Sequence, residues 1–270
     1  MNDVREEKFN PEALQRLRGL RLMDDDFMSK CFEDNSACTE LVLHIVLGRN
    51  DLKVIKTEIQ RPIRNLQGRS VIFDIYAADS TGKRYNIEIQ REDRGAGARR
   101  ARYHSSLIDA NVTEPGEKLE NLIESYVIFI TERDVLRKQL PIYHIDRVIT
   151  ETGEKFGDGA HIIYVNGACR DESPLGILMQ DFFCTNPEDM HYQVLAERVR
   201  YFKENEKGVA AMSKILEDMC NEAASVADLA AREKMAGRLL QNGKMTMEEI
   251  AEVSELSVQE VQALTAKKGA

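Results

Sequence analysis

The sequence predicts an α/β fold in which a mixed β-sheet is flanked by helices and is followed by a C-terminal all-helical extension. The stretch Ser70–Arg91 alternates apolar and polar residues on both sides of a turn, and Tyr126–Thr131 is a continuous apolar run. Period-two alternation indicates a half-buried strand, and a short apolar run is typical of a strand buried on both faces. From Ser173 onward the apolar spacing is helical, which predicts the extension.

The composition is that of a globular protein, with 43% hydrophobic and 31% charged residues among 270. No apolar run approaches the roughly 20 residues that span a bilayer, so no membrane partner is expected. The N-terminal stretch MNDVREEKFN lacks the apolar core of a secretory signal. The five cysteines are scattered without a CxxC pair, which predicts buried thiols in a reducing, cytoplasmic environment. A net charge of −9 argues against a protein that coats nucleic acid non-specifically, but it allows a local basic cluster.

The chain before the alternating stretch is predicted to hold an arm, two helices and a strand. Residues 1–23 are charged with scattered leucines and predict an N-terminal arm or short helix. The run 24–26 (DDD) then precedes apolar residues at helical spacing, which indicates a helix start. Acidic residues suit the positive end of a helix dipole, and we favour this interpretation over a metal site. A second helix is expected over about 37–47, with Glu40 near its start, and a strand over Leu52–Ile59.

The turn Asp79–Gly82 determines how the two alternating runs pair. A type I turn followed by a left-handed glycine is the usual three-residue hairpin loop with a G1 bulge. This loop pairs Asp79 with Lys83 and therefore Asp74 with Glu88, whereas a two-residue loop would put the last two on opposite faces. Like charges directly opposed in a sheet are destabilising, and a bound divalent cation is one reason to tolerate them. A solvated edge face is the alternative.

A basic cluster begins directly after this hairpin and extends into a helix predicted from residue 96 to about 112. Exposed arginines that pair with neighbouring acids are one explanation for such a cluster. The position beside two carboxylates instead favours contacts with a nucleic-acid backbone. The cluster consists of Arg91, Arg94, Arg99, Arg100 and Arg102.

Further elements are predicted along the rest of the chain. Gly208 is expected to separate two of the helices, and a bend is expected near Ser225. The predicted strands are Ile142–Ile149 and His161–Val165, and the predicted helices are Leu175–Phe183, a helix from Asn186 to about Glu206, and Val209–Leu240.

The last segment has the pattern of a helix-turn-helix. Thr246–Glu249 and Ser257–Glu260 each have the spacing of a capping box, and apolar residues follow both at helical positions. The second helix, Val258–Leu264, is neutral to acidic, whereas helices that read bases usually carry Arg, Lys or Asn. We favour a packing or assembly tail, within a C-terminal region spanning 207–270, over a DNA reader.

The ordered set of segments resembles the PD-(D/E)XK nuclease fold, and in particular the recombination-promoting nuclease (Rpn) and transposase family. The resemblance covers about residues 24 to 205, so it implies a nuclease domain over 24–206 with a restriction-endonuclease-like mixed sheet. It is carried by "DDDFMSKCF", "FDIYAADSTGKRYNIEIQRED", "RRARYHSSL" and "YVIFIT".

The resemblance also implies a site. Asp74 and Glu88 would be metal ligands, with the main-chain carbonyl of Ile89 as a further ligand. Gln90, which would be catalytic, stands where the wider superfamily has lysine; it can orient water but cannot usefully accept a proton. A third carboxylate is expected from the first pair of helices, with Glu40 as first candidate and Asp26 as second. The ion would be Mg²⁺, with Mn²⁺ as a substitute, because both carboxylate and carbonyl ligands suit it. Arg91, Arg99, Arg100 and Arg102 would hold the nucleic-acid backbone.

The function implied by the resemblance is a Mg²⁺-dependent DNA endonuclease of a mobile-element type. A homodimer is compatible with this activity, since cutting both strands usually needs two sites. The alternative is a catalytically silent nucleic-acid-binding or assembly protein on the same fold, which Gln90 and the acidic net charge motivate. A purely structural acidic-faced domain is the third option.

Overall fold

The computed structural model describes residues 9–65, 68–91 and 95–266. The chain divides into two compact units. The larger unit spans Leu14–Val209, and the smaller consists of residues up to Ala13 together with Ala210–Ala270.

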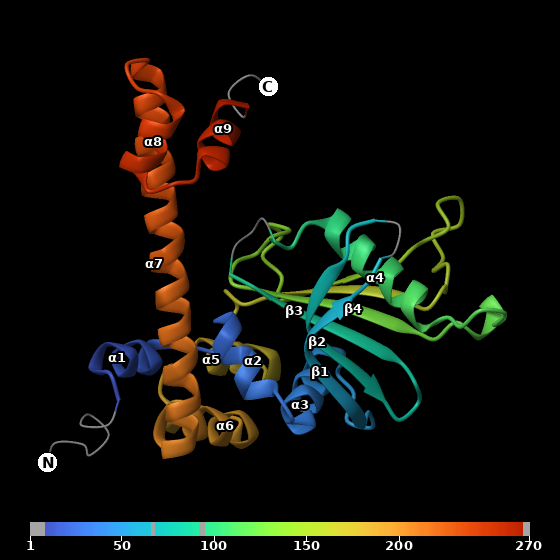
Figure 1. The fold of residues 1–270 in the computed structure, drawn as a ribbon. Helices are drawn as coiled ribbons and strands as arrows, with labels where there is room; N and C mark the ends of the chain where they lie inside the picture. The colour runs from blue at the N-terminus through green and yellow to red at the C-terminus, as the bar shows by residue number, and fades with distance from the viewer. Residues whose placement is uncertain (1–8, 66–67, 92–94, 267–270) are drawn as a thin grey trace, which may run out of the picture. The chain divides into compact units, whose positions relative to one another are not determined.

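One six-stranded mixed sheet forms the centre of the larger unit, in the order β1-β2-β3-β4-β6-β5 (Figure 1). The pairs β1–β2, β2–β3 and β5–β6 are antiparallel, whereas β3–β4 and β4–β6 are parallel. Residues 127–130 of the central strand β4 are fully buried, as a run that is apolar on both faces predicts. The predicted mixed sheet is therefore confirmed. The strands are β1 Val54–Ile63, β2 Val71–Asp79, β3 Arg84–Gln90, β4 Ser125–Thr131, β5 Ile142–Ile145 and β6 Ala160–Asn166.

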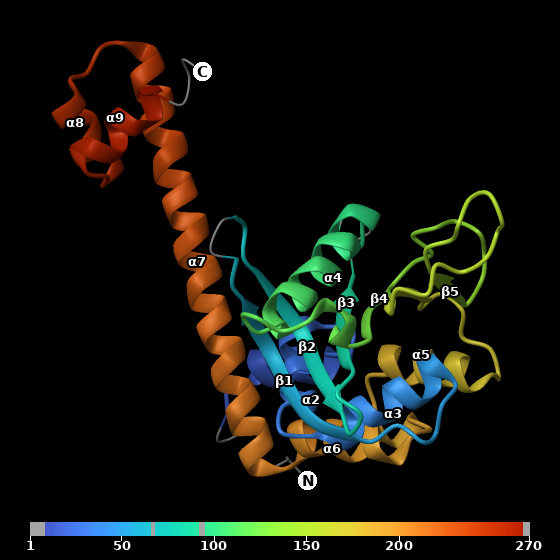
Figure 2. The ribbon, with the colours of Figure 1, turned by 90° about the vertical axis from the view of Figure 1, so that its right-hand side faces the viewer.

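Helices cover both faces of the sheet (Figures 1 and 2). Helix α4 (Ala98–Val112) is the crossover between the parallel strands β3 and β4, and its apolar side packs on one face. Phe73 and Phe129 from the sheet and Ile108 from α4 belong to the core on this side. Helices α2 (Asp25–Phe32) and α3 (Ser36–Leu47) lie on the other face, against β1 and β2. The remaining helices of this unit are α5 Pro174–Phe183 and α6 Gln193–Glu204.

Three predicted boundaries differ from the structure by four residues or more. The first strand runs to Ile63 rather than Ile59 because it continues to pair with β2 through the Ile63↔Val71 position. The helix expected from Asn186 begins only at Gln193. The preceding segment forms only a short 3-10 helix, Pro187–Asp189, and the buried carboxylate of Asp181 accepts hydrogen bonds from the main-chain N–H groups of His191 and Tyr192, just before α6 begins. Strand β5 ends at Ile145, four residues before the predicted end, because its pairing with β6 stops there.

Gly208 does not separate two helices as expected. It lies inside α7 (Glu206–Asn242), which also runs through Ser225 as one continuous helix. A Cβ atom at Gly208 would lie 2.2 Å from the main-chain oxygen of Tyr201. Glycine is therefore needed here for a close approach to the end of α6, and not to break a helix.

The smaller unit contains most of α7 with α8 (Met247–Ser254) and α9 (Val258–Ala266). Ala236, Ile250, Leu256 and Val261 form its core. Both predicted capping boxes form: Thr246 exchanges hydrogen bonds with Glu249, and Ser257 with Glu260. Helix α1 (Pro11–Gly19) crosses the boundary between the units. None of the helices in the described residues is long and apolar enough to cross a membrane.

Candidate active site

The β2–β3 hairpin has the register that its turn predicts. The main-chain N–H of Asp79 donates to the carbonyl of Lys83 (3.2 Å), and Gly82 has a φ of 90°. The same offset pairs Ile75 with Ile87, where the regular ladder ends. Asp74 and Glu88 are the next positions beyond that pair, so the hairpin directs both carboxylates to the same end of the sheet.

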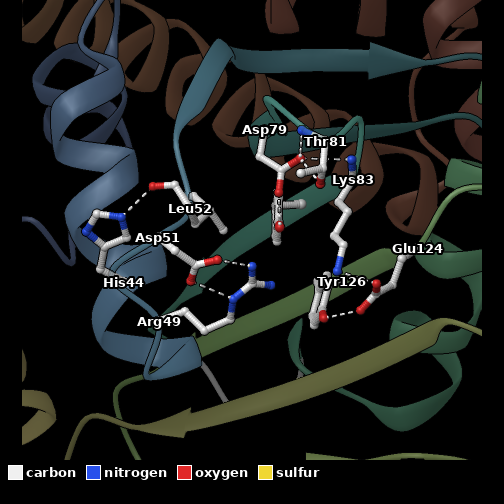
Figure 3. Close-up of polar contacts among 10 residues, drawn as sticks. His44, Arg49, Asp51, Leu52, Asp79, Thr81, Lys83, Glu124 and Tyr126 are labelled. Carbon is white, nitrogen blue, oxygen red and sulfur yellow. Dashed lines mark hydrogen bonds and ion pairs between the residues drawn. The ribbon is translucent and has the colours of Figure 1, made fainter.

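The carboxylate of Asp79 fixes the turn (Figure 3). Its Oδ1 accepts hydrogen bonds from the Thr81 N–H (2.9 Å), the Thr81 hydroxyl (2.8 Å) and the Lys83 N–H (3.0 Å), and its Oδ2 accepts one from the Tyr85 hydroxyl (2.7 Å). Burial acts to raise the pKa of Asp79, but the hydrogen bonds, led by those from Tyr85 and Thr81, outweigh it and lower the pKa. A charged acceptor with this many local donors holds the loop at its observed length.

Asp74 and Glu88 contact each other through the backbone. Oδ2 of Asp74 accepts a hydrogen bond from the N–H of Ile89 (2.8 Å), and the N–H of Asp74 points at Oε1 of Glu88 (3.5 Å). Burial, followed by the charge of Glu88, raises the pKa of Asp74 to about 8, and burial raises the pKa of Glu88. Two adjacent carboxylates that resist ionisation together are suited to a cation.

Three side chains surround the fully buried carboxylate of Glu88. Nη2 of Arg100 donates to Oε2 of Glu88 (2.9 Å), and Nε of Arg100 donates to Nε2 of His104 (3.3 Å). Nδ1 of His104 lies 3.5 Å from Oε1 of Glu88 and 3.1 Å from Nδ2 of Asn86. Burial, with a smaller contribution from Arg100, lowers the pKa of His104 to about 4, so the imidazole is neutral at neutral pH. Arg100 thus supplies the positive charge beside Glu88.

Gln90 ends β3, and its side chain lies under the chain that enters α4. A Cβ atom built on Gly95 would lie 1.7 Å from Oε1 of Gln90 and 3.5 Å from Nη1 of Arg100. Glycine at position 95 therefore allows the backbone to pass close over the Gln90 amide. The arrangement brings Gln90 near the same arginine that binds Glu88.

Of the acids on the first two helices, the structure brings Asp25 and not Glu40 to this end of the sheet. Oε2 of Glu40 accepts a hydrogen bond from the N–H of Val54 (2.8 Å), and Val54 pairs with Asp79. Glu40 therefore lies at the turn end of the hairpin, about 16 Å along the strand from Asp74 at 3.3 Å per residue. The charge of Asp25 contributes to the raised pKa of Asp74. The sequence favours a helix-dipole role for this acidic run and offers Asp26 as its candidate ligand, whereas the structure brings Asp25 towards Asp74.

The four arginines of the cluster that the structure describes lie in three environments, and Arg94 is outside the described residues. Arg91 pairs with Asp24 (2.9 Å) and lies 3.7 Å from Glu132. Arg100 binds Glu88, while Arg99 and Arg102 are exposed on α4. Arg99, Arg100 and Arg102 line a groove of about 1110 Å³ between α4 and the N-terminal end of β2. Among the described residues, no acidic side chain lines this groove. The groove is lined by Pro62, Arg69, Ser70, Val71, Ile72, Arg99, Arg100, Arg102, Tyr103, His104 and Ser106.

The side chains at this site fit the requirements of a divalent metal. Across residues 9–65, 68–91 and 95–266, no three His, Cys, Asp or Glu side chains are grouped as metal ligands. Mg²⁺ does not need such a group, because it keeps several waters and binds through one or two carboxylates. Adjacent carboxylates with raised pKa values, as in Asp74 and Glu88, gain from a nearby cation. The residues present therefore fit a hydrated divalent ion.

Comparison with known proteins identifies a family. Residues 33–168 match the model of a family described as PD-(D/E)XK nuclease family transposase. The match includes the hairpin, helix α4 and strands β1 to β6. No curated protein and no solved structure matches the chain.

Proposed function

The chain belongs to the PD-(D/E)XK nuclease family transposases, and from this premise we propose that it is a divalent-metal-dependent DNA endonuclease of a mobile-element type. Its six-stranded mixed sheet flanked by helices is a restriction-endonuclease-like fold, and a nuclease-like or transposase-related function follows from the family. The observation that carries the finer proposal is the adjacency of the Asp74 and Glu88 carboxylates beside an arginine-lined groove.

Asp74 and Glu88 would hold the ion, with the carbonyl of Ile89 as a further ligand and Asp25, whose charge acts on Asp74, as an additional carboxylate. Mg²⁺, or Mn²⁺ in its place, would supply a Lewis acid and a water of lowered pKa there. Ile89 supports this assignment because its N–H already fixes the Asp74 carboxylate. Glu40 is the less suitable third ligand because it is engaged at the start of β1.

The remaining side chains have separate roles in phosphodiester hydrolysis. The amide of Gln90 can donate and accept hydrogen bonds, so it can orient a water but does not take up its proton. Arg100 acts against the burial that raises the pKa of Glu88, and it also lines the groove, where a phosphate would lie. Arg99 and Arg102 are available for the DNA backbone, whereas Arg91 is engaged by Asp24.

A catalytically silent nucleic-acid-binding protein on the same fold is the second candidate. Two observations favour it: Gln90 replaces a lysine of the wider superfamily, and Arg100 already neutralises Glu88 without a metal. In this candidate the groove binds DNA and the carboxylates are structural. A cytoplasmic homodimer would serve either function, and sedimentation velocity of the full chain tests the dimer.

Cleavage of supercoiled plasmid with Mg²⁺ or Mn²⁺ separates the two candidates. The nuclease predicts nicking or linearisation that EDTA abolishes and that Asp74→Asn and Glu88→Gln each reduce at least about 100-fold, as expected for loss of metal catalysis. Asp51→Asn, at an exposed position next to Arg49, is the control that keeps wild-type cleavage. Metal-dependent cleavage that survives both site substitutions contradicts the proposal, and DNA binding without any cleavage favours the silent protein.

A further inference from the structure

The groove beside the carboxylates combines two kinds of surface, of which the first is cationic. Arg99 and Arg102 lie on one face of α4, three residues apart, and Arg69 reaches the groove from the segment before β2. Residues at this spacing on a helix have Cβ atoms about 5–6 Å apart. Arg100 lines the same groove while its Nη2 binds Glu88, so the groove is continuous with the candidate active site.

The second surface is apolar and exposed. Ile72 on β2 has 54% of its surface exposed, although it lies among arginines. Tyr103 also lines the groove, and its hydroxyl accepts a hydrogen bond from Nδ2 of Asn65 (2.9 Å) and donates one to the carbonyl of Arg69. Hydrogen bonds hold the polar end of Tyr103 and the core packs against its side chain, so Tyr103 is a rigid, half-buried aromatic residue at the groove.

A ligand suited to both surfaces must carry negative charges and a flat apolar group. Duplex DNA presents phosphates and base edges, but its base faces are covered by stacking and pairing. A strand with unpaired bases presents phosphates together with exposed base faces, which proteins bind on aromatic and apolar side chains. The groove volume of about 1110 Å³ exceeds that of most small-molecule sites, so it has room for more than one nucleotide.

We propose that this groove binds unpaired nucleotides of a DNA strand, with phosphates on Arg69, Arg99 and Arg102 and a base against Tyr103 and Ile72. The bound segment continues into the active site, so the substrate is DNA with a single-stranded region next to the cut. This part of the inference rests on the proposed function, whereas the binding itself does not.

Binding is measured on the full chain in EDTA by fluorescence anisotropy, so that cleavage plays no part. The probes are a labelled twelve-residue oligothymidylate, an abasic strand of the same length and a duplex of the same length. Stacking of a base on a side chain is worth about 1–3 kcal/mol, so the oligothymidylate is expected to bind roughly 5- to 150-fold more tightly than the abasic strand. Equal affinity for these two strands, or tightest binding to the duplex, overturns the proposal. Tighter binding of the matching oligouridylate overturns the assignment to DNA.

Two variants separate the apolar from the cationic contribution. Ile72→Thr keeps a β-branched side chain in the strand and is expected to reduce the preference for oligothymidylate over the abasic strand by about tenfold, the equivalent of 1.4 kcal/mol. Ile55→Thr is the matched control, because Ile55 is 63% exposed on β1 and does not line the groove. An unchanged preference in Ile72→Thr contradicts the base contact.

The double variant Arg99→Ala/Arg102→Ala is expected to weaken both single strands alike and to reduce the salt dependence of binding. Lys214→Ala, an exposed cation on α7, is its control.

Failure of the inference and failure of the proposed function are distinguishable. Selective binding of single strands in EDTA without cleavage in Mg²⁺ supports the groove as a single-strand site and contradicts the nuclease. Cleavage of duplex DNA without preference for a single-stranded flap supports the nuclease and contradicts the inference about the groove.

Discussion

Nη2 of Arg100 lies 2.9 Å from Oε2 of Glu88, a carboxylate with no exposed surface. This contact joins the first turn of α4 to the end of β3. A buried carboxylate that loses its ionic partner retains its desolvation penalty, whereas an exposed arginine near it has little to lose. Arg100 should therefore contribute more to stability than Arg99 and Arg102, the exposed arginines of α4 that line the same groove.

We expect Arg100→Leu to lower the free energy of unfolding by about 1–3 kcal/mol, since Glu88 is left buried without its partner. Urea denaturation followed by circular dichroism measures the change. Arg102→Leu, on the exposed side of the same helix, is expected to stay within about 0.5 kcal/mol of wild type. Adding Glu88→Gln to Arg100→Leu is expected to recover part of the loss, and equal effects of the two arginine variants contradict this account.

Asp79→Asn is expected to destabilise the fold by about 2–3 kcal/mol, because an amide replaces a charged acceptor of hydrogen bonds from Tyr85, Thr81 and Lys83. Thermal or urea unfolding at pH 7 measures the difference. Glu154→Gln, at an exposed position outside the core, serves as the control. If Asp79→Asn lowers the free energy of unfolding no more than Glu154→Gln does, the hydrogen bonds of Asp79 do not stabilise the fold.

The same pair of proteins gives a pH dependence. The folded pKa of Asp79 lies below its ordinary 3.8, so the folded state binds fewer protons than the unfolded state just below that pH. The stability from this carboxylate is present above pH 3.8 and is lost as the pH falls through the folded pKa. The difference in free energy of unfolding between wild type and Asp79→Asn should therefore be constant from pH 7 to about 4 and become smaller below pH 4. A difference in free energy of unfolding that grows as the pH falls contradicts a lowered pKa of Asp79.

His104 should titrate well below the ordinary histidine pKa of 6.5. Its pKa falls from 6.5 to about 4 in the folded state, mainly through burial, so the unfolded state binds the proton first. Stability associated with the neutral ring is complete above pH 6.5 and is lost as the pH falls from 6.5 towards 4. Proton NMR of the imidazole signals measures the pKa, with His104→Asn assigning the peak. A peak that titrates near pH 6.5 contradicts the buried, neutral ring.

Two glycines of α7 should respond to alanine in opposite directions. Gly208→Ala places a methyl group 2.2 Å from the Tyr201 oxygen, so we expect a loss of about 1–3 kcal/mol from overpacking. A methyl group on Gly237 would have nothing within 4 Å, and Gly237→Ala should stabilise its helix by about 0.5–1 kcal/mol. Because the glycines lie in different units, hydrogen exchange of α6 and of α7 is the suitable measurement. Similar effects at both positions contradict the close approach.

Local chemistry accounts for what the sequence could predict. The hairpin offset depends on the turn residues Asp79 and Gly82, and the central strand β4 on an unbroken apolar run, so both were accessible from adjacent residues. The two C-terminal capping boxes are likewise set by residues three apart. Each of these features needs no knowledge of the rest of the chain.

The features that could not be predicted depend on contacts between distant segments. Asp25 approaches Asp74 because α2 packs on β2, and the acidic run gives no sign of which of its members faces the sheet. The carboxylate of Glu40 accepts a hydrogen bond from the N–H of Val54, a contact that depends on how α3 packs against β1. Gly208 looked like a helix breaker because its neighbour across the turn, Tyr201, lies on another helix. In all three cases the partner is fixed by tertiary packing.

The loop after Asp79 has a consequence for how this protein can change over generations. A substitution in the loop weakens individual hydrogen bonds, but the gain or loss of a single codon there would shift the whole of β3 by one position. Such a shift turns every side chain of a strand to the opposite face. If the turn keeps its three-residue form, an isoleucine then takes the place of Glu88 beside Asp74: Ile87 after a gain and Ile89 after a loss. Loop length, rather than loop composition, is therefore the inherited property that this hairpin constrains most tightly.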